Sequence, residues 1–182
     1  MKILKYPHPS LFHKCKPLIK VDKEVKDVVA EMREFIYGGA LGLAATQVGK
    51  PYNLFVTKYE ELPVIINPVL YLYGGFYESI EGCLSIPNLE LNILRHKKVK
   101  ITGYDLEGNE IKMAVSKDIA RVCQHEKDHL EGVLFINKAK QGQIEQMIGV
   151  LHGLLEEFDK NPLDKELWQK EIEQLEIERC LL

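Results

Sequence analysis

Three features are missing from this sequence, and each absence argues against a class of protein. No apolar run approaches the length of about 20 residues that a membrane-spanning helix needs. The 24 basic residues do not outnumber the 27 acidic ones, so the basic excess common in nucleic-acid-binding proteins is lacking. The N-terminus, MKILKYPHPSLFHK, is broken by prolines and charges, unlike a secretory signal. We therefore expect a cytoplasmic or organellar protein that binds neither membrane nor DNA.

The cysteines also lack a pairing pattern. Cys15, Cys83, Cys123 and Cys180 are widely spaced, and no two of them form a CxxC motif. In a chain without an export signal, disulfides are not expected. Each cysteine taken alone is expected to be a small buried apolar residue.

The sequence predicts helices near its N-terminus, after its middle section and over its C-terminal part. After Asp22, a residue suited to cap a helix, apolar residues recur at 3.6-residue spacing and predict a helix over residues 22–37. Ser116 begins a second predicted helix that runs to about residue 131, before Gly132. From Gly142 onward the pattern is helical again, with a break at Asn161 and Pro162 and a last helix that carries Trp168.

The middle of the chain contains short runs typical of β-strands. They are NLFVT (53–57), PVIINP (63–68), VLYLYGGF (69–76), KKVKITGYD (97–105), IKMAV (111–115) and VLFIN (133–137). Residues 107–109 resemble a hairpin turn, and ALGLAATQVG (40–49) is typical of a tightly packed loop or strand edge. Strands between flanking helices indicate an α+β fold. At 182 residues we expect one main unit, residues 1–140, with a helical extension, residues 141–182, packed on it.

The strongest chemical signal is the sequence His125-Glu126-Lys127-Asp128-His129 on the second predicted helix. Residues four apart share a helical face, so both imidazoles can reach one metal ion. Glu126 points to the side, where it can act on a water molecule at that ion. The spacing therefore predicts a metal site.

Catalytic metal sites usually have three protein ligands and one position for water, so a third ligand is needed. A third histidine at the spacing of the extended HExxH motif is excluded, because Phe135 stands there. Glu156 or Glu157 is an alternative, but both resemble the solvated face of an apolar helix. Cys83 lies in the loop-like stretch EGCLSIP (81–87), where Gly82 allows a close backbone approach.

Three motifs together resemble those of the peptide deformylases. They are GLAATQ (42–47), EGCLS (81–85) and HEKDHL (125–130), in the family's order and approximate spacing, and the resemblance covers about residues 1–137. It implies an α+β fold with mixed, mostly antiparallel sheets around a central metal-binding helix. It also implies removal of the N-formyl group from formyl-methionine at the start of nascent chains, with release of formate.

The resemblance also implies roles for single residues. Cys83, His125 and His129 would hold one divalent ion, Fe(II) in the first place and otherwise zinc, nickel or cobalt. Glu126 would be the acid/base, and Gln47 with the backbone N–H of Leu84 would polarise the formyl oxygen.

Further residues are expected around these. A tight site lined by Gly42, Ala44 and Ala45 would admit a formyl group and exclude larger acyl groups. Arg95 matches a family arginine near the substrate backbone, and Glu81 would orient either a ligand or Arg95.

The face of the metal helix departs from the family pattern. Asp118 and Arg121 share a stripe with His125 and His129, at positions where the family generally has apolar residues of the methionine pocket. One interpretation is an i, i+3 pair that stays in water. The other is a more open or more polar pocket in which Arg121 contacts the substrate.

Competing functions and partners stay open at this point. An HExxH metallopeptidase with another third ligand and a silent binding module are the alternatives to an N-formyl hydrolase. Nascent N-formylated polypeptides are the expected partners, with transient ribosome association as a further expectation. From Asp164 onward the chain has six acidic and three basic residues, which argues against phosphate binding by its C-terminal segment.

Overall fold

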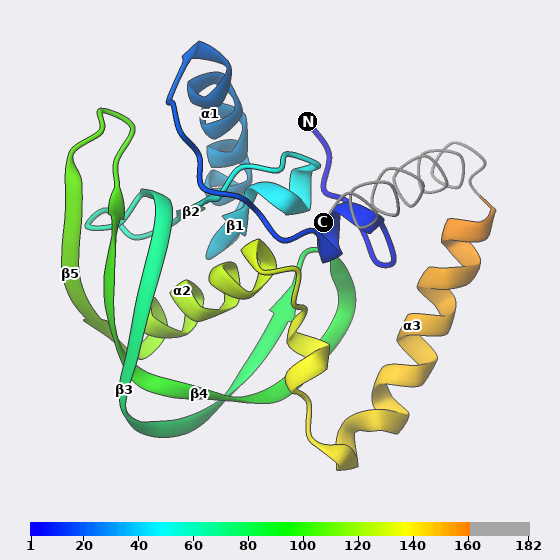
Figure 1. The fold of residues 1–182 in the computed structure, drawn as a ribbon. Helices are drawn as coiled ribbons and strands as arrows, with labels where there is room; N and C mark the ends of the chain where they lie inside the picture. Colours follow the sequence, from blue (N-terminus) through cyan, green and yellow to red (C-terminus); the bar gives the residue numbers. More distant parts are fainter. Residues whose placement is uncertain (161–182) are drawn as a thin grey trace, which may run out of the picture.

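The structure is a computed structural model that describes residues 1–160, in which one sheet curves around a helix (Figure 1). The five strands are β1 Gly42–Ala44, β2 Leu54–Thr57, β3 Val64–Cys83, β4 Ile86–Tyr104 and β5 Glu110–Ser116. They pair in the order β1-β2-β3-β4-β5, and every pairing is antiparallel. The expected α+β class is confirmed. The predicted break at Asn161 and Pro162 and the last predicted helix lie outside the described residues.

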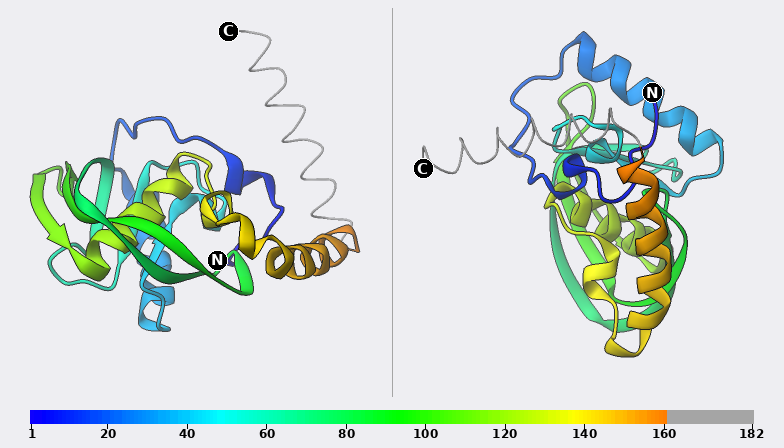
Figure 2. Two further views of the ribbon diagram at one scale, coloured as in Figure 1. Left: turned by 90° about the horizontal axis from the view of Figure 1, so that it is seen from below. Right: turned by 90° about the vertical axis from the view of Figure 1, so that its right-hand side faces the viewer.

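Within residues 1–160, three α-helices accompany the sheet. They are α1 Lys23–Tyr37, α2 Lys117–Leu130 and α3 Ile144–Asp159, and short 3₁₀ helices occur at Pro9–Phe12, Ala45–Val48, Phe135–Lys138 and Gln141–Gln143. Helix α2 lies on the concave side of the curved sheet, and α3 lies at the end of the molecule opposite β5 (Figures 1 and 2). Within the described part of the chain, no helix combines the length and the apolar character needed to span a bilayer.

The first two predicted helices are confirmed almost to the residue. The Asp22 carboxylate accepts a hydrogen bond from the Val25 N–H at 3.1 Å, which caps α1. Ser116 stands at the N-cap of α2 but forms no side-chain cap there. Gly132 follows the end of α2 with φ +71°, a left-handed conformation that favours glycine.

The hairpin of β3 and β4 is much longer than the sequence runs indicate. PVIINP and VLYLYGGF belong to one strand, interrupted by register shifts between Ile66 and Val69 and between Tyr73 and Phe76. The stretch EGCLSIP is not a loop, because Cys83 ends β3 and Ile86 begins β4 after a two-residue turn. The metal-site motif is therefore fixed by strand pairing.

The prediction of a strand at VLFIN is wrong. Residues Phe135–Lys138 form a 3₁₀ helix, and Asn137 accepts a hydrogen bond from the Leu134 N–H through its side-chain oxygen. The Val133 N–H bonds back to Asp128 at the end of α2. A short apolar run is equally suited to a strand or to a buried turn, and here Leu134 and Phe135 are buried without strand pairing.

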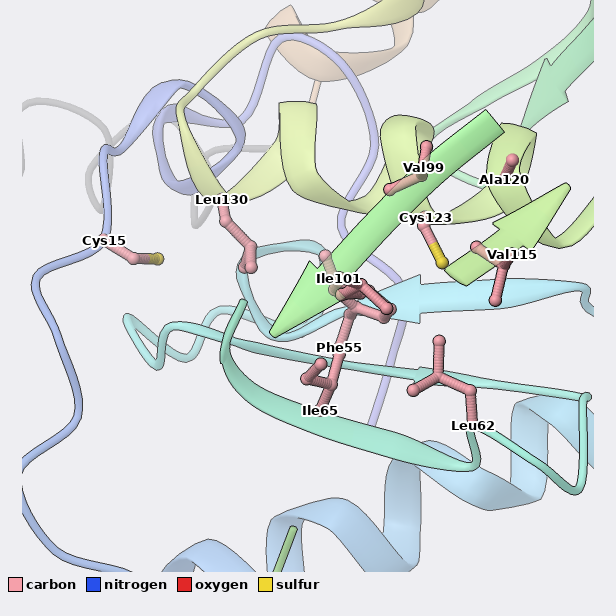
Figure 3. Packing of buried hydrophobic residues seen from close by; sticks show 11 residues of the cluster. Cys15, Phe55, Leu62, Ile65, Val99, Ile101, Val115, Ala120, Cys123 and Leu130 are labelled. Carbon is pink, nitrogen blue, oxygen red and sulfur yellow. The ribbon is translucent and has the colours of Figure 1, made fainter. Parts of the chain in front are cut away.

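The core between the sheet and α2 holds this helix in place. Phe55, Ile65, Val99, Ile101 and Val115 from the sheet form one buried cluster with Ala120, Cys123 and Leu130 of α2 (Figure 3). Burial raises the pKa of the Cys15 and Cys123 thiols to about 11 and about 12. These two cysteines are the small buried residues that the sequence predicts, and both are free thiols.

Two smaller clusters attach the outer helices. One face of α1, formed by Val25, Val28, Val29 and Met32, packs on Leu43 of β1 and on Leu54 and Val56 of β2. Leu154 of α3 packs with Leu89, Leu91 and Ile93 of β4. Each helix therefore buries an apolar stripe, as its spacing predicts.

Gly132 gives a testable prediction about stability. A Cβ at this position would lie 2.3 Å from the Phe12 carbonyl oxygen, and the positive φ alone costs about 1–2 kcal/mol for another residue. We expect Gly132→Ala to lower the free energy of unfolding by more than that amount, measured by urea denaturation. Gly108→Ala is the matched control, because Gly108 has φ +84° with no atom within 4 Å of an added Cβ. Equal losses in both variants would show that the contact with Phe12 is unimportant.

Candidate metal centre

The end of β3 and the middle of α2 bring three metal-binding side chains together. The ligand atoms of Cys83, His125 and His129 all lie within 4.8 Å of one another. The Cys83 Sγ and His129 Nε2 atoms are 3.3 Å apart, and the two imidazole rings have centroids 5.0 Å apart. A tetrahedral ion with a thiolate and an imidazole would place these donor atoms about 3.5 Å apart. The donor set and its spacing therefore fit one metal ion with a fourth position for water.

The charges of this cluster also favour a cation. Burial raises the pKa of the Cys83 thiol, but the two imidazoles outweigh this effect and hold the pKa well below its usual value. Burial lowers the pKa of His125, yet the Cys83 sulfur and the Glu81 carboxylate together raise it to about 10. The protein surroundings thus stabilise a thiolate beside a positive charge, which a metal ion can supply.

Glu81 connects the hairpin to the metal helix. Its carboxylate accepts a hydrogen bond from His125 Nδ1 at 2.9 Å, which leaves Nε2 of that ring for a metal. The same carboxylate accepts two hydrogen bonds from Arg95, both at 2.8 Å. Burial raises the pKa of Glu81, but Arg95 and His125 more than compensate and lower it to about 2.

Arg95 does not line the cleft where the sequence places it. Its side chain is 2% exposed and is held by Glu81 and, at 2.5 Å, by Asp128 of α2. The guanidinium is thus bound by two carboxylates outside the cleft, and its position does not support contact with a substrate backbone. Of the two roles considered for Glu81, the structure shows contacts with both partners, His125 and Arg95.

Gln47 lies on the 3₁₀ helix after β1 and faces the cysteine. Its side-chain oxygen accepts a hydrogen bond from the Ala44 N–H at 2.9 Å, which fixes the orientation of the amide. Its Nε2 donates to the Ser85 hydroxyl at 3.2 Å and lies 3.4 Å from Cys83 Sγ. The Gln47 amide nitrogen is therefore shared between Ser85 and the Cys83 ligand of the metal-binding cluster.

Glu126 is buried beside the ligands. One of its carboxylate oxygens, Oε2, has no hydrogen-bond partner among the described residues. Burial raises the pKa of this carboxyl to about 7, against the opposing effect of both imidazoles. A Cβ added at Gly42 would lie 2.5 Å from the other oxygen, so only glycine fits there without displacing Glu126.

A cleft of about 780 Å³ opens over this cluster. Gly42, Gln47, Cys83, Leu84, Arg121 and Glu126 are among its lining residues. The expected tight site of Gly42, Ala44 and Ala45 is only partly correct, because Ala44 and Ala45 are fully buried in the core and do not line the cleft. The cleft is also far larger than a formyl group, so it has room for the chain that carries one.

Asp118 and Arg121 behave differently from each other. Their side chains approach to 3.9 Å, so the predicted i, i+3 pair is present but long. Asp118 is 75% exposed, whereas Arg121 is 13% exposed and lines the cleft. The interpretation that both side chains stay in water is therefore correct for Asp118 and not for Arg121.

Three residues beside the site were not singled out from the sequence. The Thr46 hydroxyl donates to the His129 carbonyl at 3.3 Å, Ser85 accepts from Gln47, and Asp128 holds Arg95. All three lie inside the quoted motifs, so motif membership was the available signal. Glu156 and Glu157, the alternative ligands, are exposed on α3.

The site combines a thiolate from β3 with two imidazoles from an HExxH helix, and a buried glutamate and a cleft lie beside them. This combination defines the class of metal-dependent hydrolases. The sequence profile of the polypeptide deformylase family matches residues 1–145. The peptide deformylase of Rhodopirellula baltica is 38% identical over 165 residues, which cover 87% of this chain and 80% of the relative. That of Dictyoglomus turgidum is 39% identical over 141 residues, covering 76% and 92%.

Solved structures agree with the sequence comparison. A Plasmodium falciparum peptide deformylase structure superposes with a TM-score of 0.83 at 31% identity, over 88% of this chain and 99% of that one. A Legionella pneumophila peptide deformylase gives 0.78 at 28% identity, over 88% and 98%. This chain belongs to the peptide deformylase family. Its reaction is the metal-dependent hydrolysis that removes the N-formyl group from newly made polypeptides.

The geometry predicts that Cys83 is needed to retain the metal. We expect Cys83→Ser to weaken metal binding by at least about 100-fold, beyond the 10–100-fold loss typical when only an outer partner of a ligand is removed. The measurement is metal content by mass spectrometry after dialysis against a weak chelator. Cys15→Ser, at a buried cysteine outside the cluster, is the control and should keep its metal. Full metal content in Cys83→Ser would instead indicate a different third ligand.

Proposed function

We propose that Cys83, His125 and His129 hold one divalent ion in this deformylase, and that the ion is Fe(II). Zinc, nickel and cobalt are the alternatives, because a thiolate with two imidazoles suits each of them and metal availability decides between them. When bound, the ion supplies Lewis-acid activation of a water molecule and of the formyl carbonyl. The observation that carries the proposal is the convergence of the three ligand atoms within 4.8 Å.

Glu126 is proposed as the group that moves the proton. Its buried carboxylate, with a pKa of about 7, can accept a proton from the attacking water near neutral pH. It can then deliver that proton to the amine that leaves as formate is released. The unpartnered Oε2 is free of the hydrogen bonds that would hold it in one protonation state.

Gln47 and Leu84 are proposed to stabilise the charge that develops on the formyl oxygen. The Gln47 amide is oriented before substrate arrives, because Ala44 holds its oxygen and Ser85 faces its nitrogen. Leu84 lies in the turn directly after Cys83 and lines the cleft, so its backbone N–H is the second proposed donor. In other oxyanion holes, loss of one such donor raises the barrier by about 2.7–4 kcal/mol.

The remaining proposals concern the surroundings of the reaction. Gly42 is proposed to line the substrate path, and Arg95 and Glu81 to orient His125 from the side opposite its metal-binding nitrogen.

We also propose a cytoplasmic enzyme with nascent N-formylated chains as substrates and transient contact with the ribosome. Residues 1–140 are proposed as the catalytic domain and residues 141–182 as an extension of it. The burial of Leu154 and Phe158 supports this packing for α3, and residues 161–182 lie outside the described part of the chain.

The direct test is formate release from formyl-Met-Ala-Ser by anaerobically purified protein of known metal content. We expect Glu126→Gln to lower kcat by about 10²–10⁴-fold without loss of metal, because general acid–base catalysis contributes that much. Glu156→Gln, at an exposed position of α3, is the matched control and should keep full activity. Equal rates in Glu126→Gln and the parent would remove Glu126 from the mechanism.

Arg121 is proposed to contact the substrate from the α2 side of the cleft. Its guanidinium is mostly buried and only loosely paired with Asp118, so it can bind an oxygen of the substrate. This wall is polar where an apolar one would suit a methionine side chain.

We expect Arg121→Leu to shift the ratio of kcat/KM values for formyl-Met-Ala-Ser and formyl-Gln-Ala-Ser toward methionine by about 10-fold or more, since apolar pocket contacts discriminate by about 10–200-fold. Asp118→Asn should leave the ratio unchanged, because Asp118 is exposed. An unchanged ratio in Arg121→Leu would mean that Arg121 does not reach the substrate side chain.

A further inference from the structure

The outward face of β3, β4 and β5 carries tyrosines and lysines in three neighbouring rows. The strand register aligns Tyr73, Lys98 and Ser116, then Tyr71, Lys100 and Ala114, then Val69, Thr102 and Lys112. The intervening residues, such as Val99 and Ile101, are buried against α2, so the rows point away from that helix. We call Tyr71, Tyr73, Lys98, Lys100 and Lys112 the tyrosine–lysine face.

This face is accessible within the described part of the chain. Tyr71 is 65% exposed and Val69 is 64% exposed. Tyr71 and Val69 are therefore open to solvent on this face, and Tyr73 beside them is partly buried. Thr102 and Ala114 are small, so nothing projects between the longer side chains.

The tyrosine rings are ordered by their neighbours. The Lys100 ammonium lies 5.9 Å from the centre of the Tyr71 ring and 5.7 Å from that of Tyr73, both within cation–π range. The ring centres are 6.2 Å apart and the ring planes differ by 33°. The aliphatic part of the Lys98 side chain packs on Gly74, and a Cβ added at Gly74 would lie 3.1 Å from Lys98 Cγ. The rings and the ammonium groups thus form one ordered surface.

The charge of this surface is opposite to that of the whole chain. The formal net charge of the protein is −3, but the three rows contain three lysines, and the acidic residue next to them on this face is Glu110, in the adjoining row beside Lys112. Among residues 1–160, none of Lys98, Lys100 and Lys112 forms an ion pair with a carboxylate. A ligand that is both anionic and rich in flat rings therefore complements the face.

We propose that the tyrosine–lysine face binds single-stranded RNA. Bases stack on Tyr71 and Tyr73, and phosphates lie at Lys98, Lys100 and Lys112. RNA-binding sheets stack bases on aromatic side chains, and single-strand binding surfaces place positive charge along the path of the phosphates. A duplex hides the faces of its bases, and an acidic peptide would use the lysines but leave the rings uncovered. Since the substrates of this enzyme are polypeptides in synthesis, RNA is the nucleic acid near its place of action.

The test is fluorescence anisotropy of a labelled single-stranded oligoribonucleotide with the metal-loaded, full-length protein. Three phosphate contacts predict a slope of about −2 for the logarithm of the binding constant against the logarithm of salt concentration, from about 0.7 per contact on single strands. Tyr71→Ala and Tyr73→Ala should each weaken binding by about 10-fold, as loss of one stacking platform does. The double variant K98E/K100E should abolish measurable binding.

Matched controls separate this site from general charge effects and from catalysis. Lys16→Glu makes a similar charge change at an exposed position on the segment that pairs with the end of α2, and it should leave RNA binding unchanged. All variants should release formate from formyl-Met-Ala-Ser at the parental rate, because none of these residues lines the cleft.

Several outcomes would overturn the proposal. They are an absence of binding at about 50 mM salt, equal affinity for duplex and single-stranded RNA, and equal weakening by Lys16→Glu. Sedimentation velocity provides a further check. A parental dimer that K98E/K100E dissociates would identify a second copy of the chain, rather than RNA, as the occupant of the face.

Discussion

The rest of the site depends on the buried ion pairs of Glu81 with His125 and Arg95. Glu81 stands on β3 and its partners on α2 and β4, so one carboxylate fixes the hairpin against the metal helix. Removal of one member of such a buried set typically costs about 3–5 kcal/mol, because the other charge is left unpaired. The placement of Cys83, two residues after Glu81 at the end of β3, follows from the same contact.

The second constraint is close packing between the backbone and the side chains beside the metal-binding cluster. Gly42 leaves space for the Glu126 carboxylate, and Ala44 offers its N–H to Gln47. Both contacts join β1 and the following 3₁₀ helix to the residues around the metal cluster. The short β1 strand therefore contributes to the site through its backbone, whereas β3 and α2 contribute side chains.

Local periodicity explains which elements the sequence predicts well. Helix α1 follows from 3.6-residue spacing and from its Asp22 cap, and α2 follows from the positions of Ser116 and Gly132 at its two ends; these are properties of a few neighbouring positions. The sequence does not mark the first half of β4 as a strand, although Leu89, Leu91 and Ile93 alternate with exposed residues. The motif around Cys83, which directly precedes it, has the composition of a loop. At VLFIN the sequence predicts a strand where the chain forms a 3₁₀ helix, because a five-residue apolar run does not specify how its backbone is paired.

Contacts between residues far apart in the chain separate what the sequence determined from what only the tertiary structure decided. The sequence alone determined the metal-binding chemistry, because HExxH places two imidazoles on one helical face and the three motifs resemble one family. Only the tertiary structure decided that Cys83 meets those imidazoles, that Arg95 turns inward and that Arg121 lines the cleft. It also decided that an acidic chain has a basic, aromatic sheet face. These features depend on strand register and on packing between residues far apart in the chain, which spacing along the sequence does not encode.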